Sequence, residues 1–555
     1  MTTLSAKHIL LMAGSALMLM ACGGGGGSSS TPVATPPPPP PPTGGGGTQT
    51  PVSVTLSGTL TFDRVPNNPV TNALNFNATT QMPIRFAPVE LVSGTTVLDS
   101  TVSDENGAYS FTLDSGQNVS VRVLSEIQRT EGNIIDFQVV DNTSNNALYA
   151  LQGAASEVPP NDQTRDLNAG SGWGGSSYVS TRAAAPFALL DTIYATLEDI
   201  IAVDPNVNFP AFDVLWSVQN RAVQGDVSDG EIGTSSFTIS NGVPVIRILG
   251  DENNDTDEFD VHVVVHEFGH YFENTLSRAD SIGGPHSLND RLDARVAFGE
   301  GWGNALSGMI LDDPLYRDSF GPQQSQGFSF NVESNNIGAR GWFSESSVQS
   351  ILYDIFDSDN DGVDTVSLGL GPIYDAFVSE DYQNTEAFTS IFSFMDAIDS
   401  QPGVTPSDLT PLLTGQNITS RNEFALGETD NGGLPDQLPL YLPVQTNGTP
   451  VNFCSVDTFG TLNKHGNRRY LTFDVATGGT FTFNMVRTSG PANSDPDFTI
   501  FSRGQFIANA ISGNADQETI SVTLDPGTYV IDGRDFRNER DNLSVPEACF
   551  NFTIQ

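Results

Sequence analysis

The sequence VHVVVHEFGHYFEN, residues 261–274, carries three of the six histidines of the chain at intervals of four residues. On a helix, His266 and His270 would project from one face about one turn apart. That spacing lets two imidazole nitrogens reach one zinc ion at about 2.0–2.1 Å. Glu267 would then point at the open position of the metal, where it could take a proton from water.

A β-strand is the alternative interpretation of this stretch, because its three consecutive valines are poor helix formers. In a strand, His266 and Glu267 would face opposite sides of the sheet and no metal site would form. The helix is favoured because apolar residues keep helical spacing over residues 259–276, a run longer than a usual strand. Asp257 and Asp260 offer N-terminal caps for this helix.

A third ligand is offered by Glu300 in the sequence VAFGEGWGNALSG, residues 296–308, which has the apolar spacing of a second helix. Asn304 lies one turn after Glu300 and could hydrogen-bond a ligand histidine. His262 is not expected to be a ligand, because eight helical residues separate it from His270 by about 12 Å. Small residues allow two helix backbones to approach one ion closely; here they are Gly299, Gly301 and Gly303, with Gly269 on the first helix.

Together, His266, Glu267, His270 and Glu300 resemble the zinc site of the gluzincin metallopeptidases, nearest to the fungalysin branch. The resemblance implies a zincin-like α+β catalytic domain, a Zn²⁺ ion held by the two histidines and Glu300, and Glu267 as the base. Two flanking segments are similar to the edge strand and the linker of that branch: residues 235–255 and 276–292.

The family also supplies a later histidine or a tyrosine that stabilises the tetrahedral oxyanion, and it commonly has Asp where this chain has Asn304. No histidine follows His286 within the catalytic region, so the candidates for this donor are His286, Tyr353 and Arg340. We expect Tyr353, in a segment with helical spacing, to supply it. The alternative is that Tyr353 packs in a core.

A second cation, Ca²⁺, is a candidate for an acidic loop. Asp357, Asp359 and Asp361 alternate before a glycine, as in the opening of an EF-hand loop. The twelfth loop position is Leu368 rather than Glu, so a simple acidic turn is the alternative.

The N-terminus resembles the signal of a bacterial lipoprotein. Residues 9–20 are apolar but too few to span a membrane. Residues 19–22 resemble the lipobox, which implies that Cys22 carries the lipid. Gly23, rather than Asp, follows the cysteine, and this implies the outer membrane of a bacterial cell envelope. A plain secretory signal is the alternative.

The other two cysteines, Cys454 and Cys549, lie near the C-terminus. In an exported protein they suggest a disulfide, and two separate buried thiols are the alternative.

Composition predicts an α+β multidomain protein. After the signal (1–22), residues 23–51 form a Gly/Ser/Pro tether. Residues 52–128 alternate apolar and polar side chains and resemble a prealbumin-like β-sandwich. Residues 129–437 mix helical and strand patterns around the zinc motif. Residues 438–555 predict a β-sandwich similar to domains that follow the catalytic unit of secreted bacterial peptidases.

The chain has 23 basic and 66 acidic residues, a formal charge of −43. Such a charge repels nucleic acid and anionic lipid, so membrane contact is expected only through Cys22. These observations predict an exported, monomeric, zinc-dependent endopeptidase acting on protein or peptide. Two alternatives stay open: an aminopeptidase with the same ligands, and a catalytically inactive adhesive or surface-binding lipoprotein, which Asn304 and the missing late histidine would favour.

Overall fold

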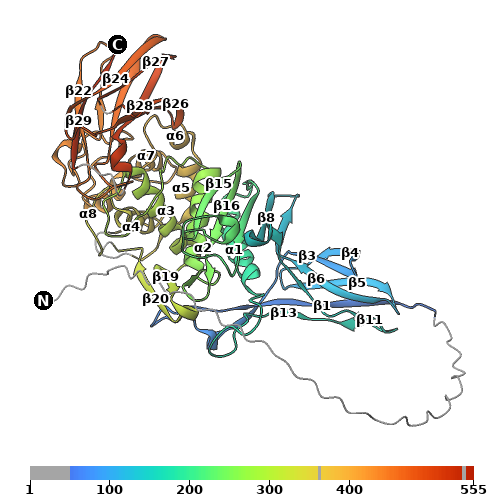
Figure 1. Ribbon diagram of the computed structural model, residues 1–555. Helices are drawn as coiled ribbons and strands as arrows, with labels where there is room; N and C mark the ends of the chain where they lie inside the picture. The colour runs from blue at the N-terminus through green and yellow to red at the C-terminus, as the bar shows by residue number, and fades with distance from the viewer. Residues whose placement is uncertain (1–49, 335, 360–363, 515, 541–545) are drawn as a thin grey trace, which may run out of the picture. The chain divides into compact units, whose positions relative to one another are not determined.

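The computed structural model describes residues 50–334, 336–359, 364–514, 516–540 and 546–555, and residues 51–555 form one compact unit (Figure 1). The signal segment, Cys22 and all but the last two residues of the tether lie outside the described residues, so the predictions about them stay predictions. Within the described residues, no helix is both long and apolar enough to cross a bilayer.

Two five-stranded sheets occupy the first part of the unit. The strands of the first sheet all pair with its central strand, β1 (Ser53–Arg64); they are β2 (Thr80–Pro83), β5 (Ala108–Asp114), β12 (Gln163–Thr164) and β13 (Leu167–Ala169). The second sheet contains β3 (Pro88–Ser93), β4 (Thr96–Val102), β6 (Asn118–Leu124), β10 (Ala150–Gln152) and β11 (Ser156–Glu157). Four of these strands lie beyond residue 128, because the chain returns to both sheets after it has entered the next one. The domain limits stay a prediction.

A six-stranded sheet lies at the centre of the chain and ends in the expected edge strand. Its strands are β7 (Glu126–Arg129), β8 (Ile135–Asp141), β9 (Ala147–Leu148), β14 (Phe212–Trp216), β15 (Ser236–Ser240) and β16 (Val243–Ile248). Strands β8, β14 and β16 run parallel, and β15 pairs antiparallel with β16 at the edge. Helices α1 (Ala185–Val203) and α2 (Val261–Thr275) pack against this sheet.

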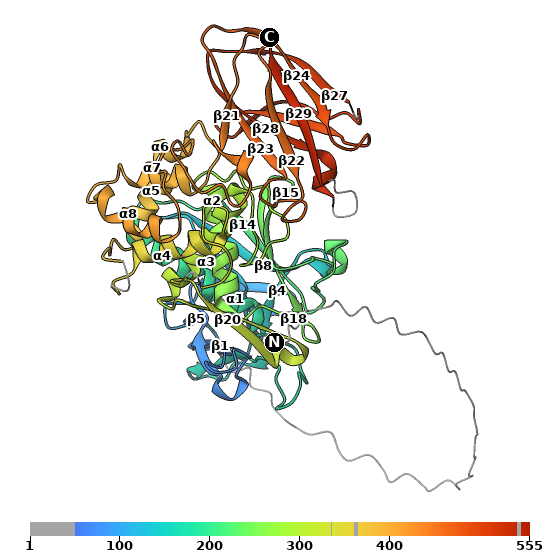
Figure 2. The ribbon, with the colours of Figure 1, turned by 90° about the vertical axis from the view of Figure 1, so that its left-hand side faces the viewer.

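The remaining helices follow α2, and α3 packs along both α2 and α4 (Figures 1 and 2). They are α3 (Ala294–Leu311), α4 (Glu345–Phe356), α5 (Leu370–Val378), α6 (Glu380–Gln383), α7 (Ile391–Ile398) and α8 (Pro406–Gly415). Two short hairpins flank α2 and α3: β17 (Gly250–Asp251) with β18 (Asp255–Thr256), and β19 (Leu315–Phe320) with β20 (Gln326–Asn331).

Helix α2 contains the histidine motif and is helical as expected, and its valines show why. Val263, Val264 and Val265 are all buried, so burial offsets their weak helix propensity. Asp260 takes the N-cap position, but its side chain makes no cap bond. Its carboxylate instead accepts bonds from Asn67 Nδ2 and Ser319 Oγ, both at 2.6 Å. The prediction of a capping side chain at Asp260 is therefore wrong.

The C-terminal part forms two sheets over one apolar core, as a β-sandwich requires. One sheet contains β21 (Tyr441–Pro443), β23 (Arg468–Val475), β25 (Pro496–Ser502), β26 (Gln505–Ala510) and β28 (Gly527–Asp535). The other contains β22 (Val451–Val456), β24 (Gly479–Ser489), β27 (Gln517–Leu524) and β29 (Glu547–Ile554).

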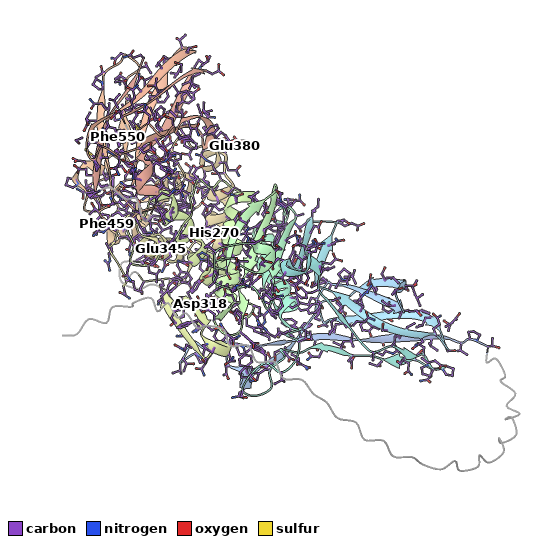
Figure 3. All side chains as sticks on the ribbon, viewed as in Figure 1. His270, Asp318, Glu345, Glu380, Phe459 and Phe550 are labelled. Carbon is purple, nitrogen blue, oxygen red and sulfur yellow. A yellow bond between two sulfur atoms is a disulfide. The ribbon has the colours of Figure 1, made fainter. Side chains whose placement is uncertain are left out.

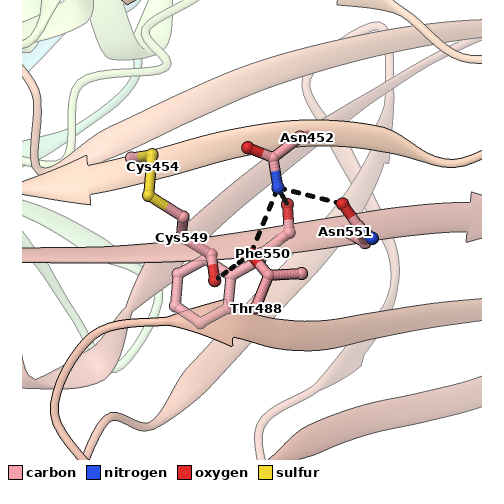
Figure 4. Close-up of a disulfide and its surroundings, with 6 residues drawn as sticks. All are labelled: Asn452, Cys454, Thr488, Cys549, Phe550 and Asn551. Atoms are coloured by element: carbon pink, nitrogen blue, oxygen red, sulfur yellow. Dashed lines mark hydrogen bonds between the residues drawn. A yellow bond between two sulfur atoms is a disulfide. The ribbon is translucent and has the colours of Figure 1, made fainter.

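Cys454 and Cys549 lie opposite each other on β22 and β29 and form a disulfide with an S–S distance of 2.03 Å (Figure 4). Beside it, Asn452 Nδ2 donates to Asn551 Oδ1 at 2.9 Å and to the Phe550 carbonyl at 3.0 Å. In chain order β22 is the first strand of its sheet and β29 the last, and the disulfide and these bonds hold the two together.

A buried ion cluster joins the sandwich to the helical part. Arg295, at the start of α3, donates to both carboxylate oxygens of Asp293 at 2.9 Å and to Asp532 of β28 at 3.0 Å. Tyr470 donates to Asp293 at 2.5 Å, and Arg468 donates to Asp532 at 2.8 Å. Burial would raise the pKa of Asp532, but the three neighbouring arginines hold it well below its usual range.

Replacing Arg295 with Met should lower the free energy of unfolding by about 3–5 kcal/mol, because two buried carboxylates lose their shared partner. Chemical denaturation measures this loss. The matched control is Arg503→Met, whose exposed pair with Glu386 (3.7 Å, Arg503 56% exposed) should contribute less than about 1 kcal/mol. Equal losses of stability in the two variants would contradict a stabilising role of the buried Arg295 cluster.

Candidate metal centre

Three predicted ligand atoms converge. His266 Nε2 and His270 Nε2 lie 3.1 Å apart, and each lies 3.3 Å from Glu300 Oε2. The histidines project from one face of α2, and Glu300 approaches from α3. The three side chains are largely buried.

Two glycines allow this approach. A Cβ on Gly269 of α2 would lie 3.0 Å from the Cα of Gly303 on α3. A Cβ on Gly303 would lie 2.8 Å from His266 Nδ1. Trp302 Nε1 donates to the Gly269 carbonyl at 3.0 Å and ties the helices together at the same level. Any larger side chain at Gly303 would displace the His266 ring.

Asn304 takes the position that the sequence predicts for it. Its Oδ1 lies 2.9 Å from His266 Nδ1, and its Nδ2 donates to Gln349 Oε1 at 3.0 Å. Because Gln349 occupies the amide nitrogen, the amide oxygen faces His266 and accepts the Nδ1 proton. This tautomer leaves the Nε2 lone pair free for a metal.

Glu267 is buried beside the ligand atoms, and its Oε2 accepts no hydrogen bond from the described residues. Burial raises the pKa of Glu267, although the two histidines and a backbone N–H of Phe237 act to lower it. Phe237 belongs to the edge strand β15. A buried carboxylate with one unpaired oxygen, beside three ligand atoms, has the properties of a general base.

His286 also reaches the site. The sequence offers it only as one of three candidates for the donor that stabilises the oxyanion. His286 Nε2 lies 3.1 Å from Glu300 Oε2, and its Nδ1 lies 2.7 Å from Glu345 Oε2. Glu345, labelled in Figure 3, is the first residue of α4. Burial would lower the pKa of His286, but the charges of Glu300 and Glu345 raise it to about 9. His286 is the only histidine between His270 and His465, and that could have singled it out.

The segment that carries His286 is held by a loop of the C-terminal sandwich. Asn463 Nδ2 donates to the Gly283 carbonyl at 2.8 Å, and Lys464 Nζ donates to the Pro285 carbonyl at 2.6 Å. Lys464 also lies 3.3 Å from Asp290. The C-terminal part therefore contributes to the position of a residue in the site.

Tyr353 does not reach the site. Its ring lies on α4 against Gly308, where a Cβ would come within 2.9 Å of Cε2, and it is 4% exposed. Arg340 donates to the Gly415 carbonyl at 2.9 Å. Neither residue lines the cavities beside His266 and Glu267. Tyr353 packs in the core, which was the alternative interpretation, and His286 replaces it as the candidate donor.

The predicted calcium loop is only partly described. Asp357 ends α4 and Asp359 follows it, but Asp361 lies outside the described residues. Burial and neighbouring acids raise the pKa of Asp357 to about 7. Calcium at this loop stays a prediction.

The donor set fits a zinc ion. A tetrahedral ion with bonds of about 2.1 Å separates its ligand atoms by roughly 3.4 Å. The observed separations are 3.1 Å between the two Nε2 atoms and 3.3 Å from each to Glu300 Oε2. Two imidazoles and one carboxylate also match the ligand set of catalytic zinc, which keeps one position open.

Two cavities, of about 620 Å³ and 480 Å³, meet at this centre. Both are lined by His266, Glu267 and His286. The larger extends along α2 past Glu273, and the smaller extends the other way, past Val263. The candidate centre is therefore open on two sides.

Residues 249–397 match the family model for the Mycolysin C-terminal domain. The match contains His266, Glu267, His270 and Glu300. This part of the chain is therefore related to a metalloprotease domain. No curated protein sequence matches the chain.

Several solved structures, three of them as follows, are similar to about a fifth of the chain. The pre-peptidase C-terminal domain of collagenase from Bacillus anthracis has 10% identity, covering 21% of this chain and 92% of its own, with a TM-score of 0.16. The periplasmic g-type lysozyme inhibitor PliG of Aeromonas hydrophila has 15% identity, 21% and 96% coverage, and a TM-score of 0.15. CBM35 from Cellvibrio japonicus Abf62 has 16% identity, 20% and 88% coverage, and a TM-score of 0.12.

Replacing Gly303 with Ala should weaken zinc binding at least about tenfold, because the added methyl group displaces His266. Titration of metal-depleted protein with zinc measures this affinity. Gly371→Ala on α5 is the control, since a Cβ there meets no atom within 4 Å. If zinc affinity in Gly303→Ala equals that of the wild type, the close crossing does not control the site.

Proposed function

We propose that this chain is a zinc-dependent endopeptidase. The observation that carries the proposal is the convergence of two imidazole nitrogens and one carboxylate oxygen beside Glu267, a buried acid with an unpaired oxygen. His266, His270 and Glu300 would hold the ion. When bound, zinc supplies Lewis acidity toward a water molecule and a peptide carbonyl. The match of residues 249–397 to a metalloprotease-related domain supports this reading.

The edge strand β15 offers a place for an extended peptide. This strand lies at the edge of its sheet, and an extended chain can pair with such an edge. Ser236 and Phe237 of β15 line the larger cavity together with Glu267. A peptide paired with this strand would therefore pass beside the base.

Glu267 would accept a proton from the attacking water and return it to the leaving amine. His286 can donate from Nε2 to the carbonyl oxygen as negative charge develops there, while Glu345 holds the opposite ring nitrogen. Asn304 keeps His266 in the tautomer that a metal ligand requires.

The two cavities favour an endopeptidase over an aminopeptidase. They extend in opposite directions from His266, Glu267 and His286, so a peptide can continue on both sides of the cleaved bond. Comparison of N-terminally blocked and free peptides tests this choice: an endopeptidase cleaves both.

We also propose that the enzyme is exported and anchored through Cys22 in the outer membrane, on the strength of the lipobox-like segment. An inactive adhesive lipoprotein is the rival reading. Its support in the sequence is Asn304 and the missing late histidine. Against it stand the contact of Asn304 Oδ1 with His266 Nδ1 and the His286 imidazole, whose Nε2 lies 3.1 Å from Glu300 Oε2.

Replacing Glu267 with Gln should lower kcat by about 10²–10⁴-fold, because the variant loses the proton acceptor. Zinc content should stay at one ion per chain. Casein hydrolysis, with metal analysis of the same sample, measures both. Glu380→Gln, at the start of α6, is the control and should keep wild-type activity. Full activity of Glu267→Gln would rule out the proposed base.

Replacing His286 with Asn should lower kcat by about 10²–10³-fold with little change in KM or zinc content, because the variant loses a donor to the developing oxyanion. Steady-state kinetics on a fluorogenic peptide measures the two constants. Tyr353→Phe should behave as the wild type, since Tyr353 packs in the core. The reverse result, with Tyr353→Phe inactive and His286→Asn active, would restore the prediction made from the sequence.

A further inference from the structure

Three aspartates form a second group of converging carboxylates, separate from the zinc ligands. Asp255 and Asp257 lie just before α2. Asp318, labelled in Figure 3, lies on β19. One oxygen from each lies within 4.8 Å of the other two. The residues come from two segments about 60 positions apart, so the fold brings them together.

Several oxygens of this group have no partner. Asp257 is 3% exposed, and its Oδ2 accepts a hydrogen bond from Ser235 Oγ. From the described residues, neither Asp257 Oδ1 nor Asp318 Oδ1 accepts a bond. Gln324 is fully buried and donates from Nε2 to Asp255 at 3.3 Å, but its Oε1 is also unpaired. Among the ion pairs of the described residues, none involves these aspartates. The neighbouring Asp260 differs, because both of its oxygens accept bonds.

Charged carboxylates buried at this spacing are costly, and either protonation or a cation between them removes the cost. Burial raises the pKa of Asp255 to about 6, although hydrogen bonds from Gln324 and with Asp257 act to lower it. Burial and the charges of Asp260 and Asp255 raise the pKa of Asp318 to about 9. A cation would remove the repulsion and satisfy the free oxygens.

The chemistry of the donors selects the ion. All the free atoms are oxygens of carboxylates or an amide, which hard cations prefer, whereas zinc prefers nitrogen and sulfur. Calcium binds oxygens at about 2.3–2.6 Å, so two of its ligands can lie up to about 5 Å apart. The three carboxylate oxygens all lie within 4.8 Å of one another, close enough to share one such ion.

We propose that Asp255, Asp257 and Asp318 bind one Ca²⁺ ion. All three line the smaller cavity, from which water can complete the coordination. The ion would join β18 and β19 at the N-terminal end of α2, the helix that carries His266 and Glu267. Calcium binding at this site requires neither zinc nor catalysis, so its test is independent of the proposed peptidase activity.

The test is equilibrium dialysis of the full chain, freed of metal and reloaded with one equivalent of zinc, against radioactive CaCl₂. Asp318→Asn and Asp257→Asn are compared with Asp251→Asn. Asp251 belongs to the same acidic run, and its Oδ1 accepts from Asn253 N at 3.0 Å, a bond that Asn can also accept. Melting temperatures with and without millimolar CaCl₂ are recorded for each.

The wild type should bind one Ca²⁺ and melt at a higher temperature in CaCl₂. Asp318→Asn and Asp257→Asn should bind it at least about tenfold more weakly, and Asp251→Asn as the wild type. If Asp257→Asn does not fold, the result for Asp318→Asn alone is decisive. Absence of calcium binding in the wild type, or equal affinity in Asp318→Asn, overturns the proposal. Without calcium binding, a selective loss of kcat/KM in Asp318→Asn for peptides with Arg or Lys would make the cluster a subsite for basic side chains instead.

Discussion

Helices α2 and α3 touch backbone to backbone at Gly269 and Gly303, and this contact sets the distance between Glu300 and the histidine pair. Glycine inside a helix costs about 1 kcal/mol relative to alanine, so these positions lower the stability of each isolated helix. Burial of both helices and the bond from Trp302 to the Gly269 carbonyl offset that cost. The geometry of the site therefore depends on the absence of two side chains.

Around this crossing, each functional side chain is held by a neighbour. Gln349 orients Asn304, which orients His266. Glu345 holds His286, and the C-terminal sandwich holds the segment on which His286 lies. A general base and a donor that act on one carbonyl need such fixed positions, because small displacements reduce rates strongly. The buried ion pair between Arg295 of α3 and Asp532 of the sandwich also fixes these two parts together.

The features that the sequence predicts are those with local spacing. His266, Glu267 and His270 occupy one helix, and glycines beside Glu300 indicate the second one. The pairing of His286 with Glu345 joins positions 59 residues apart, and no local pattern encodes it. The segment that carries Tyr353 has helical spacing, but this spacing does not show which other element the buried face of the helix contacts.

Long-range pairing limits prediction elsewhere too. Strands β12 and β13 join β1 across more than 100 residues, and their two or three residues are too short for a recognisable alternation. In the sequence, the acidic run of residues 251–260 is a weaker calcium candidate than residues 357–361, and capping and solvation explain it well enough. Asp318, which completes the cluster, lies on a later hairpin that no local pattern connects with this run.

Anomalous diffraction at the zinc edge from crystals of the zinc-loaded protein tests the central claim most directly. The account predicts one strong peak bonded to His266 Nε2, His270 Nε2 and a Glu300 oxygen at about 2.0–2.2 Å, with Glu267 beside it but not bonded. A peak that lacks Glu300 as a ligand, or that lies elsewhere in the molecule, would contradict it.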